Sequence, residues 1–224
     1  MSGRARAMKA IGNGLLGLAL GLLSYYGLTT LVSNQAQSEL VQSSDSIPLF
    51  STESPGDLVT SAGGETPWDF EGWEAEDKAY WTALEEGGVF GRLVIPAMDL
   101  DTLVVKGVET ADLRKGPGWI DWSDLPGLTG TCGISGHRTT YGAPFRRLGE
   151  VQVGDTIELY SPYRCYRYEV TEILVVLPSQ IEVVASTEEP SLTLTACHPP
   201  YSARYRLAAR AKLVSVAAVQ DRVN

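Results

Sequence analysis

The sequence predicts an all-β domain that follows a single membrane-spanning helix. From Gly91 onward, short runs rich in β-branched residues alternate with turn residues at near-regular spacing, which is typical of a β-sandwich or a β-barrel. Before this region, the stretch from Ile11 to Val32 is apolar and carries no charge, as a membrane span requires. With 224 residues, 44% of them apolar, the chain has room for one ordinary domain and its appendages.

The apolar stretch has the length and the flanks of a membrane anchor. Its 22 residues at helical rise would span the ~30 Å hydrocarbon core, and the first charge after it is Glu39. Three basic residues precede it: Arg4, Arg6 and Lys9. By the positive-inside rule, we expect a cytoplasmic tail over residues 1–10, a transmembrane anchor over 11–33 and an extracytoplasmic remainder. The predicted location is therefore the cell membrane.

Two other interpretations of the apolar stretch fit less well. A cleaved signal peptide usually has a shorter apolar core, of roughly 7–15 residues, and no small-x-small cleavage site follows Val32. A buried helix of a soluble domain would show a polar face, which this stretch lacks.

The acidic charge of the chain belongs to the segment after the anchor. Between Asn34 and Phe90 there are twelve acids against one base, whereas from Gly91 to Asn224 there are fifteen acids against fourteen bases. The net charge of −9 also argues against a nucleic-acid partner, which would call for a basic patch. Residues 34–66 are rich in Ser, Gln, Thr, Gly and Pro, and this composition predicts a flexible acidic linker.

Residues 67–90 predict a helical appendage rich in aromatic and acidic residues. Four large side chains lie at helical spacing: Trp73, Tyr80, Trp81 and Leu84. Gly87 and Gly88 would end this helix. It could form a lid over the domain that follows, but aromatic stripes usually pack against a core. We therefore favour a helix packed on the outside of the barrel.

Residues 91–224 form the predicted β-domain, and closure into a barrel would leave no edge strands. The candidate strands are Arg92–Ile95, Thr102–Lys106, Gly133–Ser135, Thr156–Tyr160, Tyr166–Val176, Ile181–Val184, Leu192–Ala196 and Arg206–Val216. Two short helical turns are expected between them, at Thr110–Leu113 and Pro144–Leu148.

The chemistry rests on few residues. The chain has two histidines, His137 and His198, and three cysteines, Cys132, Cys165 and Cys197. Their spacing does not match a zinc site, and no Gly-x-Ser-x-Gly motif of a serine hydrolase is present. We therefore predict no metal and no cofactor. A Cys and a His far apart in sequence, with an Arg soon after the Cys, fit nucleophilic thiol catalysis.

Two strings carry this chemistry. The first, from Ile134 to Phe145, reads Ile-Ser-Gly-His-Arg-Thr-Thr-Tyr-Gly-Ala-Pro-Phe, and the second, from Thr193 to Arg206, reads Thr-Leu-Thr-Ala-Cys-His-Pro-Pro-Tyr-Ser-Ala-Arg-Tyr-Arg. Together with the Gly-x-Leu-x-Ile-Pro opening at Gly91–Pro96, they resemble the sortases over roughly Phe90 to Val216. The strings look most like class E sortases, with class D second.

The resemblance implies a closed eight-stranded sortase-type β-barrel with short helices and a transpeptidase that does not depend on calcium. Such enzymes cleave a C-terminal Leu-Pro-x-Thr-Gly or Leu-Ala-x-Thr-Gly sorting signal between Thr and Gly. They then pass the acyl group through a thioester to a cell-wall amine. The implied partners are secreted proteins with sorting signals, a cell-wall precursor or pilin amine as acceptor, and membrane lipid around the anchor.

The same resemblance assigns the catalytic roles to Cys197, His137 and Arg206, and their chemistry suits these roles. A thiolate is the reactive form of a cysteine, and a cationic neighbour favours it. Arg206 would donate from a planar, permanently charged group to the oxyanion. His137 as imidazolium would protonate the leaving amine and then accept a proton from the incoming one. Arg204 competes with Arg206 for its role, but Arg206 fits the family's register.

Substrate binding is predicted for Thr195, Ala196, Arg138 and Tyr141. The family usually carries Thr where this chain has Ala196, so we expect altered substrate positioning without loss of the chemistry. The segment Gly118–Asp124 also departs from class E relatives. Its Trp119 and Ile120 put a Leu-Ala preference in doubt.

Three further expectations concern the neighbours of the site. His198 would point away from Cys197, because successive strand residues face opposite sides. Cys132 and Cys165 are expected to be two separate buried thiols; a disulfide between them is the alternative. Two other functions stay open: a degenerate sortase-like module that binds sorting signals without turnover, and a cysteine peptidase that only hydrolyses.

Overall fold

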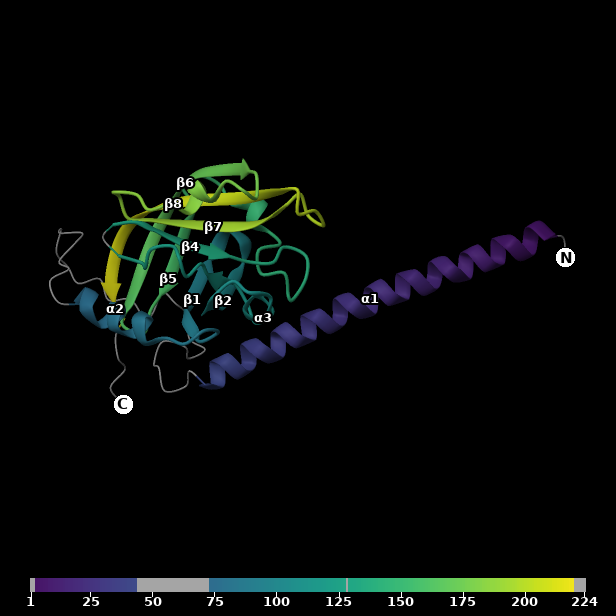
Figure 1. Cartoon of the computed structure of the whole chain (residues 1–224), viewed down its shortest axis with the longest axis horizontal. Coiled ribbons are helices and arrows are strands. Elements are labelled where there is room, and N and C mark those ends of the chain that lie inside the picture. The colour runs from purple at the N-terminus through teal and green to yellow at the C-terminus, as the bar shows by residue number, and fades with distance from the viewer. Residues whose placement is uncertain (1–2, 44–72, 128, 220–224) are drawn as a thin grey trace.

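The computed structural model describes residues 3–43, 73–127 and 129–219 of the chain (Figure 1). Its globular part is a closed barrel with the strand order β1-β2-β3-β4-β7-β8-β6-β5. The strands are β1 Val89–Ile95, β2 Leu100–Lys106, β3 Gly118–Trp119, β4 Thr131–Ser135, β5 Thr156–Tyr160, β6 Arg164–Val176, β7 Ser191–His198 and β8 Tyr205–Ala218. The predicted all-β class and the closed eight-stranded barrel are confirmed.

Two strand predictions differ from the structure. The run Ile181–Val184 is a 3-10 helix, η5, in the connection between β6 and β7. Only its last residue, Val184, is buried, while Ile181 is 58% exposed, so the run lacks the alternating burial of a strand. The two-residue strand β3 was not predicted, because it is too short to show a periodic pattern.

The helical elements are few, as predicted. They are α1 Gly3–Ser43, α2 Trp73–Ala83, η3 Pro96–Met98, α3 Thr110–Leu113, η4 Leu148–Glu150 and η5. The predicted turn Thr110–Leu113 is α3, and the turn predicted at Pro144–Leu148 leads into η4.

The barrel interior is filled by one side of each strand. On β7, Leu192, Leu194 and Ala196 belong to the main hydrophobic cluster. Their neighbours Thr193, Thr195 and Cys197 therefore face the other side of the strand. This alternation decides which residues of the Thr-Leu-Thr-Ala-Cys string can reach a substrate.

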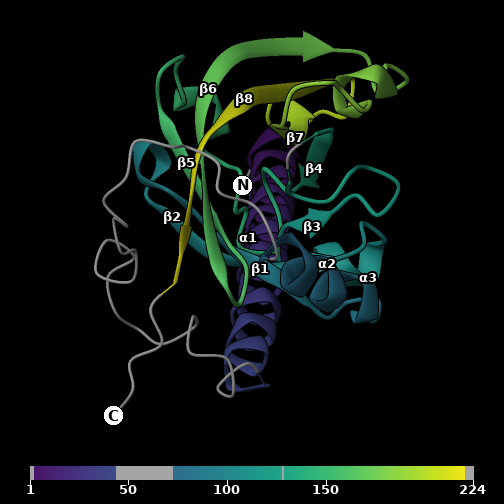
Figure 2. The same cartoon turned by 90° about the vertical axis from the view of Figure 1, so that its left-hand side faces the viewer.

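Helix α2 closes the end of the barrel at which β4 begins; Figure 2 views the molecule from the side on which α2 lies. The Trp81 Nε1 donates to the Phe90 carbonyl oxygen at 2.8 Å, and the Trp81 ring stacks on the Phe90 ring at 5.2 Å. The Tyr166 hydroxyl donates to Asp77 at 2.6 Å. Since Cys197 lies near the opposite end of β7, the described part of the appendage packs on the barrel and does not cover Cys197. Residues 67–72 lie outside the described residues.

Helix α1 is longer than the anchor predicted for residues 11–33. It continues to Ser43, so residues 34–43 of the predicted flexible linker are helical, and residues 44–66 lie outside the described residues. Within the described part of the chain, Ala7–Gln42 is the one helix that is long and apolar enough to cross a membrane. Its most apolar stretch has a mean hydropathy of 1.7, and only 6% of that stretch is buried in the protein. After Val32, the Gln37 side chain is held by hydrogen bonds to the barrel, which supports the continuation of the helix.

Candidate active site

The predicted site residues come from the adjacent ends of three strands. In the parallel β4–β7 pair, Ser135 lies opposite Thr195, and the Gly136 amide donates to the Thr195 carbonyl oxygen at 3.0 Å. In the antiparallel β7–β8 pair, Cys197 lies opposite Arg206. His137, two residues beyond Ser135, therefore leaves β4 beside the end of β7 that carries Cys197. The barrel topology brings together residues that are sixty positions apart in the sequence.

Cys197 is the accessible thiol of the three. It is partly exposed, whereas Cys132 and Cys165 are buried, and all three are free thiols. Burial raises the pKa of the Cys132 thiol well above its ordinary value and that of Cys165 to about 12. Since the thiolate is the nucleophile, Cys197 is the cysteine suited to react. The prediction of two separate buried thiols is confirmed.

His137 is half-buried, and this burial lowers its pKa below the ordinary value of 6.5. Among the described residues, its Nε2 is buried without a hydrogen-bond partner. Its ring lies 5.2 Å from the Tyr141 ring, centroid to centroid. Burial of the side chain therefore disfavours the imidazolium form and favours the neutral imidazole.

The segment that carries His137, residues 136–147, is called the His137 loop from here on. The Phe145 amide donates to the His137 carbonyl oxygen at 2.9 Å, which closes the loop. A Cβ at Gly136 would lie 2.7 Å from the Phe145 ring, so only glycine permits this packing. Tyr141 and Ala143 have positive φ angles of 51° and 47°, in a region disfavoured for L-residues. Such observed strain often accompanies a functional loop.

Arg206 is better placed than Arg204 for the predicted role as oxyanion donor beside Cys197. As the ladder partner of Cys197 it emerges on the same side of the sheet. Its Nη1 donates to the carbonyl oxygens of Ala203 and Tyr205, both at 3.2 Å, which holds the guanidinium at the strand end. Arg204 precedes β8, is exposed, and lies 5.3 Å from the Tyr205 ring.

Arg138, for which substrate binding was predicted, has a side chain that is held by other groups of the protein. Its side chain is only 9% exposed. The Nη1 contacts His198 Nδ1 at 2.8 Å and the Cys197 carbonyl oxygen at 3.4 Å. His198 thus turns away from the groove face of β7, as predicted, and is held by Arg138. This arginine therefore holds the backbone at Cys197, and its guanidinium also interacts electrostatically with the Cys197 thiol.

Ala196 also lies away from the predicted substrate side. It is 2% exposed and belongs to the hydrophobic core, because it faces the opposite side of β7 from Cys197. A methyl group suits this apolar position. The replacement of Thr by Ala therefore changes the packing behind the nucleophile and removes no group from the substrate side.

A groove of about 310 Å³ runs up to the site and includes Thr195 and Arg206 in its lining. Most of its other walls are apolar: Val108, Leu113, Ile120, Trp122, Leu177, Ile181 and Val184. The Thr193 hydroxyl donates to the Val183 carbonyl oxygen at 3.1 Å and so fixes η5 beside β7. Thr195 thus lies where substrate binding was predicted, next to an extended apolar surface.

Sequence reasoning missed several of these walls. Trp122 and η5 were not proposed as binding residues, although the unusual Gly118–Asp124 segment pointed to the region. Of the two residues that were flagged there, Ile120 lines the groove. Trp119 instead stacks on Phe90 at 4.9 Å inside the barrel.

Comparison with known proteins agrees with this geometry. Residues 93–214, more than half of the chain, match the family model described as Sortase domain. Sortase D of Bacillus subtilis is 33% identical over 127 residues, which are 56% of this chain and 62% of that protein. Sortase E1 of Streptomyces coelicolor is 28% identical over 149 residues, which are 59% of this chain and 42% of that protein. The chain thus matches about half of the length of these relatives.

Solved structures extend the similarity to the fold. A structure of sortase E1 from Streptomyces coelicolor with a tripeptide in the active site has a TM-score of 0.56 and 27% identity, covering 61% of this chain and 94% of that one. A sortase D5 transpeptidase of Clostridium perfringens has a TM-score of 0.63 at 22% identity, covering 81% and 99%. With the family model, the barrel and the shared motifs in agreement, the chain belongs to the sortase family.

Proposed function

We propose that the protein is a cysteine transpeptidase that cleaves a Leu-Pro-x-Thr-Gly-like or Leu-Ala-x-Thr-Gly-like sorting signal between Thr and Gly and transfers the acyl group to a cell-wall amine. The observation that carries the proposal is the register of three strand ends. In this register, Cys197 lies opposite Arg206, and the end of β4 that leads to His137 lies beside the end of β7. Membership of the sortase family supports the same reaction class.

In the first half of the reaction, the Cys197 thiolate attacks the carbonyl carbon of the Thr residue and a tetrahedral oxyanion forms. Arg206 donates hydrogen bonds to that oxyanion from its charged guanidinium. The His137 imidazolium gives its proton to the nitrogen of the leaving Gly amine as the C–N bond breaks. The partial burial of His137 lowers its pKa, which favours the release of this proton.

In the second half, the thioester on Cys197 reacts with an acceptor amine. His137, now neutral, takes the proton from the attacking amine, the C–S bond breaks and the thiolate is regenerated. The thioester therefore stores the acyl group between two easier steps. Attack by water instead would give hydrolysis.

The apolar groove beside Thr195 supports a substrate segment with apolar side chains. Leu and Pro or Ala of a sorting signal would bury apolar surface against walls such as Ile120, Trp122 and Leu177. The Thr carbonyl would then lie toward the end of the groove formed by Thr195 and Arg206, next to Cys197. Thr195 and Tyr141 remain the proposed polar and aromatic contacts of the substrate.

The α1 helix supports anchoring in the cell membrane, with residues 1–10 in the cytoplasm and the barrel outside, because basic residues precede the apolar stretch. Protease added to intact protoplasts should then digest the barrel and leave the anchor membrane-bound. Protection of the barrel from external protease would reverse this orientation.

Product analysis tests the reaction itself. The full chain in detergent is incubated with peptides carrying Leu-Pro-x-Thr-Gly or Leu-Ala-x-Thr-Gly, with and without triglycine as the acceptor amine, and the products are identified by mass spectrometry. A transpeptidase forms the ligated product at the expense of the hydrolysed one when the amine is present. Hydrolysis alone at every amine concentration would favour a cysteine peptidase, and binding without any product would favour a capture module.

A further inference from the structure

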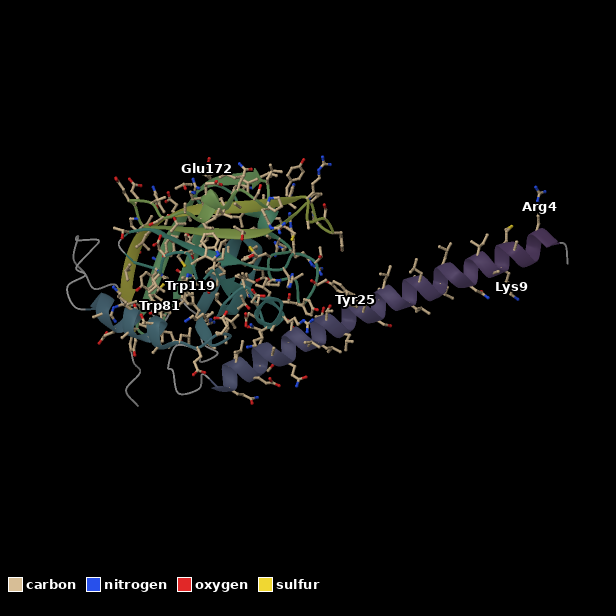
Figure 3. The ribbon with its side chains drawn as sticks, viewed as in Figure 1. Arg4, Lys9, Tyr25, Trp81, Trp119 and Glu172 are labelled. Atoms are coloured by element: carbon tan, nitrogen blue, oxygen red, sulfur yellow. The ribbon has the colours of Figure 1, made fainter. Side chains whose placement is uncertain are left out.

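We propose that α1 is docked on the barrel in a fixed orientation, and that this contact holds the His137 loop at the outer surface of the membrane. The proposal takes membrane anchoring by α1 and the active site as proposed above. It concerns α1 from Tyr26 onward, which includes the end of the predicted anchor, residues 11–33, and the start of the predicted linker, residues 34–66. Figure 3 shows Arg4 and Lys9 at the far end of α1, with Tyr25 close to where the helix reaches the barrel.

The exposure of α1 changes at Tyr26. Residues 7–25 are all exposed, whereas seven of the following positions are covered by the barrel. The covered residues are Tyr26, Thr29, Thr30, Ser33, Ala36, Gln37 and Leu40. Their spacing of three, one, three, three, one and three residues follows one face of a helix. Six of them are small, hydroxyl-bearing or amide-bearing residues, so this face suits packing against protein backbone and side chains better than contact with lipid.

Gln37 provides the most specific contact of this face. Its Nε2 donates to the carbonyl oxygens of Lys115 at 2.8 Å and Leu103 at 3.2 Å. Its Oε1 accepts from the Leu103 amide at 3.0 Å and from the Thr102 hydroxyl at 3.1 Å. A side-chain amide has two donors and two acceptor sites, and here all of them are used. Gln37 therefore completes the edge of β2 at Leu103, because β3 pairs only with Val105 and Lys106.

Two contacts link the same helix face to the His137 loop. A Cβ placed on Gly142 would lie 3.6 Å from the Ser33 Cβ and 3.3 Å from its hydroxyl oxygen, so the helix and the loop touch there. About two turns earlier, the Arg146 guanidinium carbon lies 5.4 Å from the centre of the Tyr26 ring, in a cation–π contact. The loop that carries His137 is thus built against α1.

These contacts also locate the membrane boundary. A charged Arg146 would not enter the hydrocarbon core without a large cost, so Tyr26 marks its outer limit. From Met8 to Tyr25, about 18 residues rise by about 27 Å, close to the ~30 Å of a bilayer core. The span therefore lies closer to the N-terminus than the predicted anchor at residues 11–33, with Lys9 at its cytoplasmic end. Tyr25 and Tyr26 then lie at the interface, where tyrosines are enriched. The His137 loop follows at the level of the headgroups, where a peptide held at the bilayer surface can reach the site.

Cross-linking in native membranes tests the dock without relying on activity. In a Cys197→Ala background, Ser33→Cys and Gly142→Cys are combined, because their Cβ distance matches that of a disulfide. The matched control combines Gly142→Cys with Gln35→Cys, an exposed position on the opposite face of α1. After oxidation and cleavage at a protease site inserted between residues 55 and 60, the Ser33 pair should stay joined until reduction and the Gln35 pair should separate. Separation of both pairs, or equal joining of both, would overturn the dock.

Labelling of single cysteines provides a second measurement that leaves Gly142 unchanged. In the same Cys197→Ala background, Ser33→Cys should react slowly with a water-soluble maleimide, because Ser33 is 5% exposed. Gln35→Cys, on the uncovered face, should react at the rate of an exposed thiol. Equal rates at the two positions would contradict a docked helix.

The functional consequence is tested with one peptide presented in two ways. Gln37→Ala should reduce turnover of a sorting peptide tethered to a lipid bilayer by about tenfold, because the active site is no longer held at a fixed distance from the bilayer and the effective concentration of the tethered peptide at the site falls. Turnover of the free peptide should change by less than about twofold. Gln35→Ala is the control and should alter neither. Equal loss with both forms of the peptide, or no loss with either, would contradict the placement of the active site at the membrane surface. If the unaltered protein cleaves neither form, the proposed function fails, while the cross-linking result still stands.

Discussion

Arg206 lies directly opposite Cys197 in the β7–β8 ladder, so the two side chains leave the sheet on the same face at one strand end. Arg204 is two residues earlier, outside β8 and exposed. The strand register, more than the sequence string, separates these two arginines. It assigns the oxyanion role to Arg206 in the proposed mechanism.

Replacement of Arg206 should therefore lower kcat by about 10²–10³, the usual cost of losing one oxyanion donor. Arg206→Lys should not restore activity, because an ammonium keeps the charge but lacks the planar fork. Arg204→Ala is the control and should stay close to the unaltered protein. Steady-state kinetics with a sorting peptide decides. A raised KM with nearly unchanged kcat would indicate that Arg206 only orients the peptide.

The three thiols should differ sharply in reactivity. Cys197 is partly exposed, whereas burial raises the pKa of both Cys132 and Cys165. Brief treatment of the folded protein with iodoacetamide should label Cys197 first, because thiol reactivity follows exposure and the thiolate fraction. Peptide mapping by mass spectrometry identifies the labelled residue. Comparable early labelling of Cys132 would mean that β4 is less well packed than described.

The proton on His137 should be lost at a lower pH than that of an exposed histidine, because burial lowers its pKa below 6.5. NMR titration can follow it directly, since the chain has only two histidines and His198→Gln assigns the remaining signal. Tyr141→Ala removes the ring packed beside His137 and should raise its pKa toward the ordinary value. An unchanged pKa in that variant would show that Tyr141 does not shield the imidazole.

The lowered pKa of His137 also affects the stability of the fold. A folded-state pKa below the unfolded one means that the unfolded chain takes up this proton first as the pH falls. His137 should therefore reduce the free energy of unfolding once the pH drops below about 6.5. In a His137→Asn variant, this part of the acid destabilisation should be missing from denaturant titrations at pH 5 and pH 7.

Arg138 should act on turnover through its hold on β7 and not through substrate contact. Arg138→Ala leaves His198 Nδ1 and the Cys197 carbonyl without their buried donor, and we expect kcat to fall roughly tenfold, equivalent to about 1.4 kcal/mol. KM should change little, because the groove lining does not include Arg138. A rise in KM with preserved kcat would instead restore the substrate-binding role predicted from the sequence.

The sequence predicted the barrel class and the location of most strands, and its motifs named three candidate catalytic residues. It did so because β-branched runs and turn residues are local signals, and because the motifs around His137 and Cys197 are distinctive. The strand assigned to Ile181–Val184 was wrong, since composition alone cannot distinguish a β-branched strand from a groove wall half exposed to solvent. The length of α1 was missed because Gln37 is polar in sequence and gains its partners only in the folded protein.

Which side of a strand a residue faces was the other source of error. Ala196 and Arg138 are adjacent in sequence to Cys197 and His137, and this proximity suggested substrate contact. The pleat sends the Ala196 side chain into the core, and the Arg138 side chain reaches back to His198. Conversely, Trp122 and Leu177 line the groove although no motif marks them. Proximity in sequence and proximity to the substrate are different properties of a β-barrel.

The most direct test of the account is the covalent intermediate on Cys197. The full chain is mixed with a sorting peptide, quenched in acid within seconds and digested, and the Cys197 peptide is examined by mass spectrometry. A thioester mechanism predicts a mass increase equal to the acyl part of the signal ending at Thr, located on Cys197 and removed by hydroxylamine. The Cys197→Ala variant should show neither the adduct nor cleavage. Cleavage by Cys197→Ala, or an adduct on another residue, would contradict the assignment of the nucleophile.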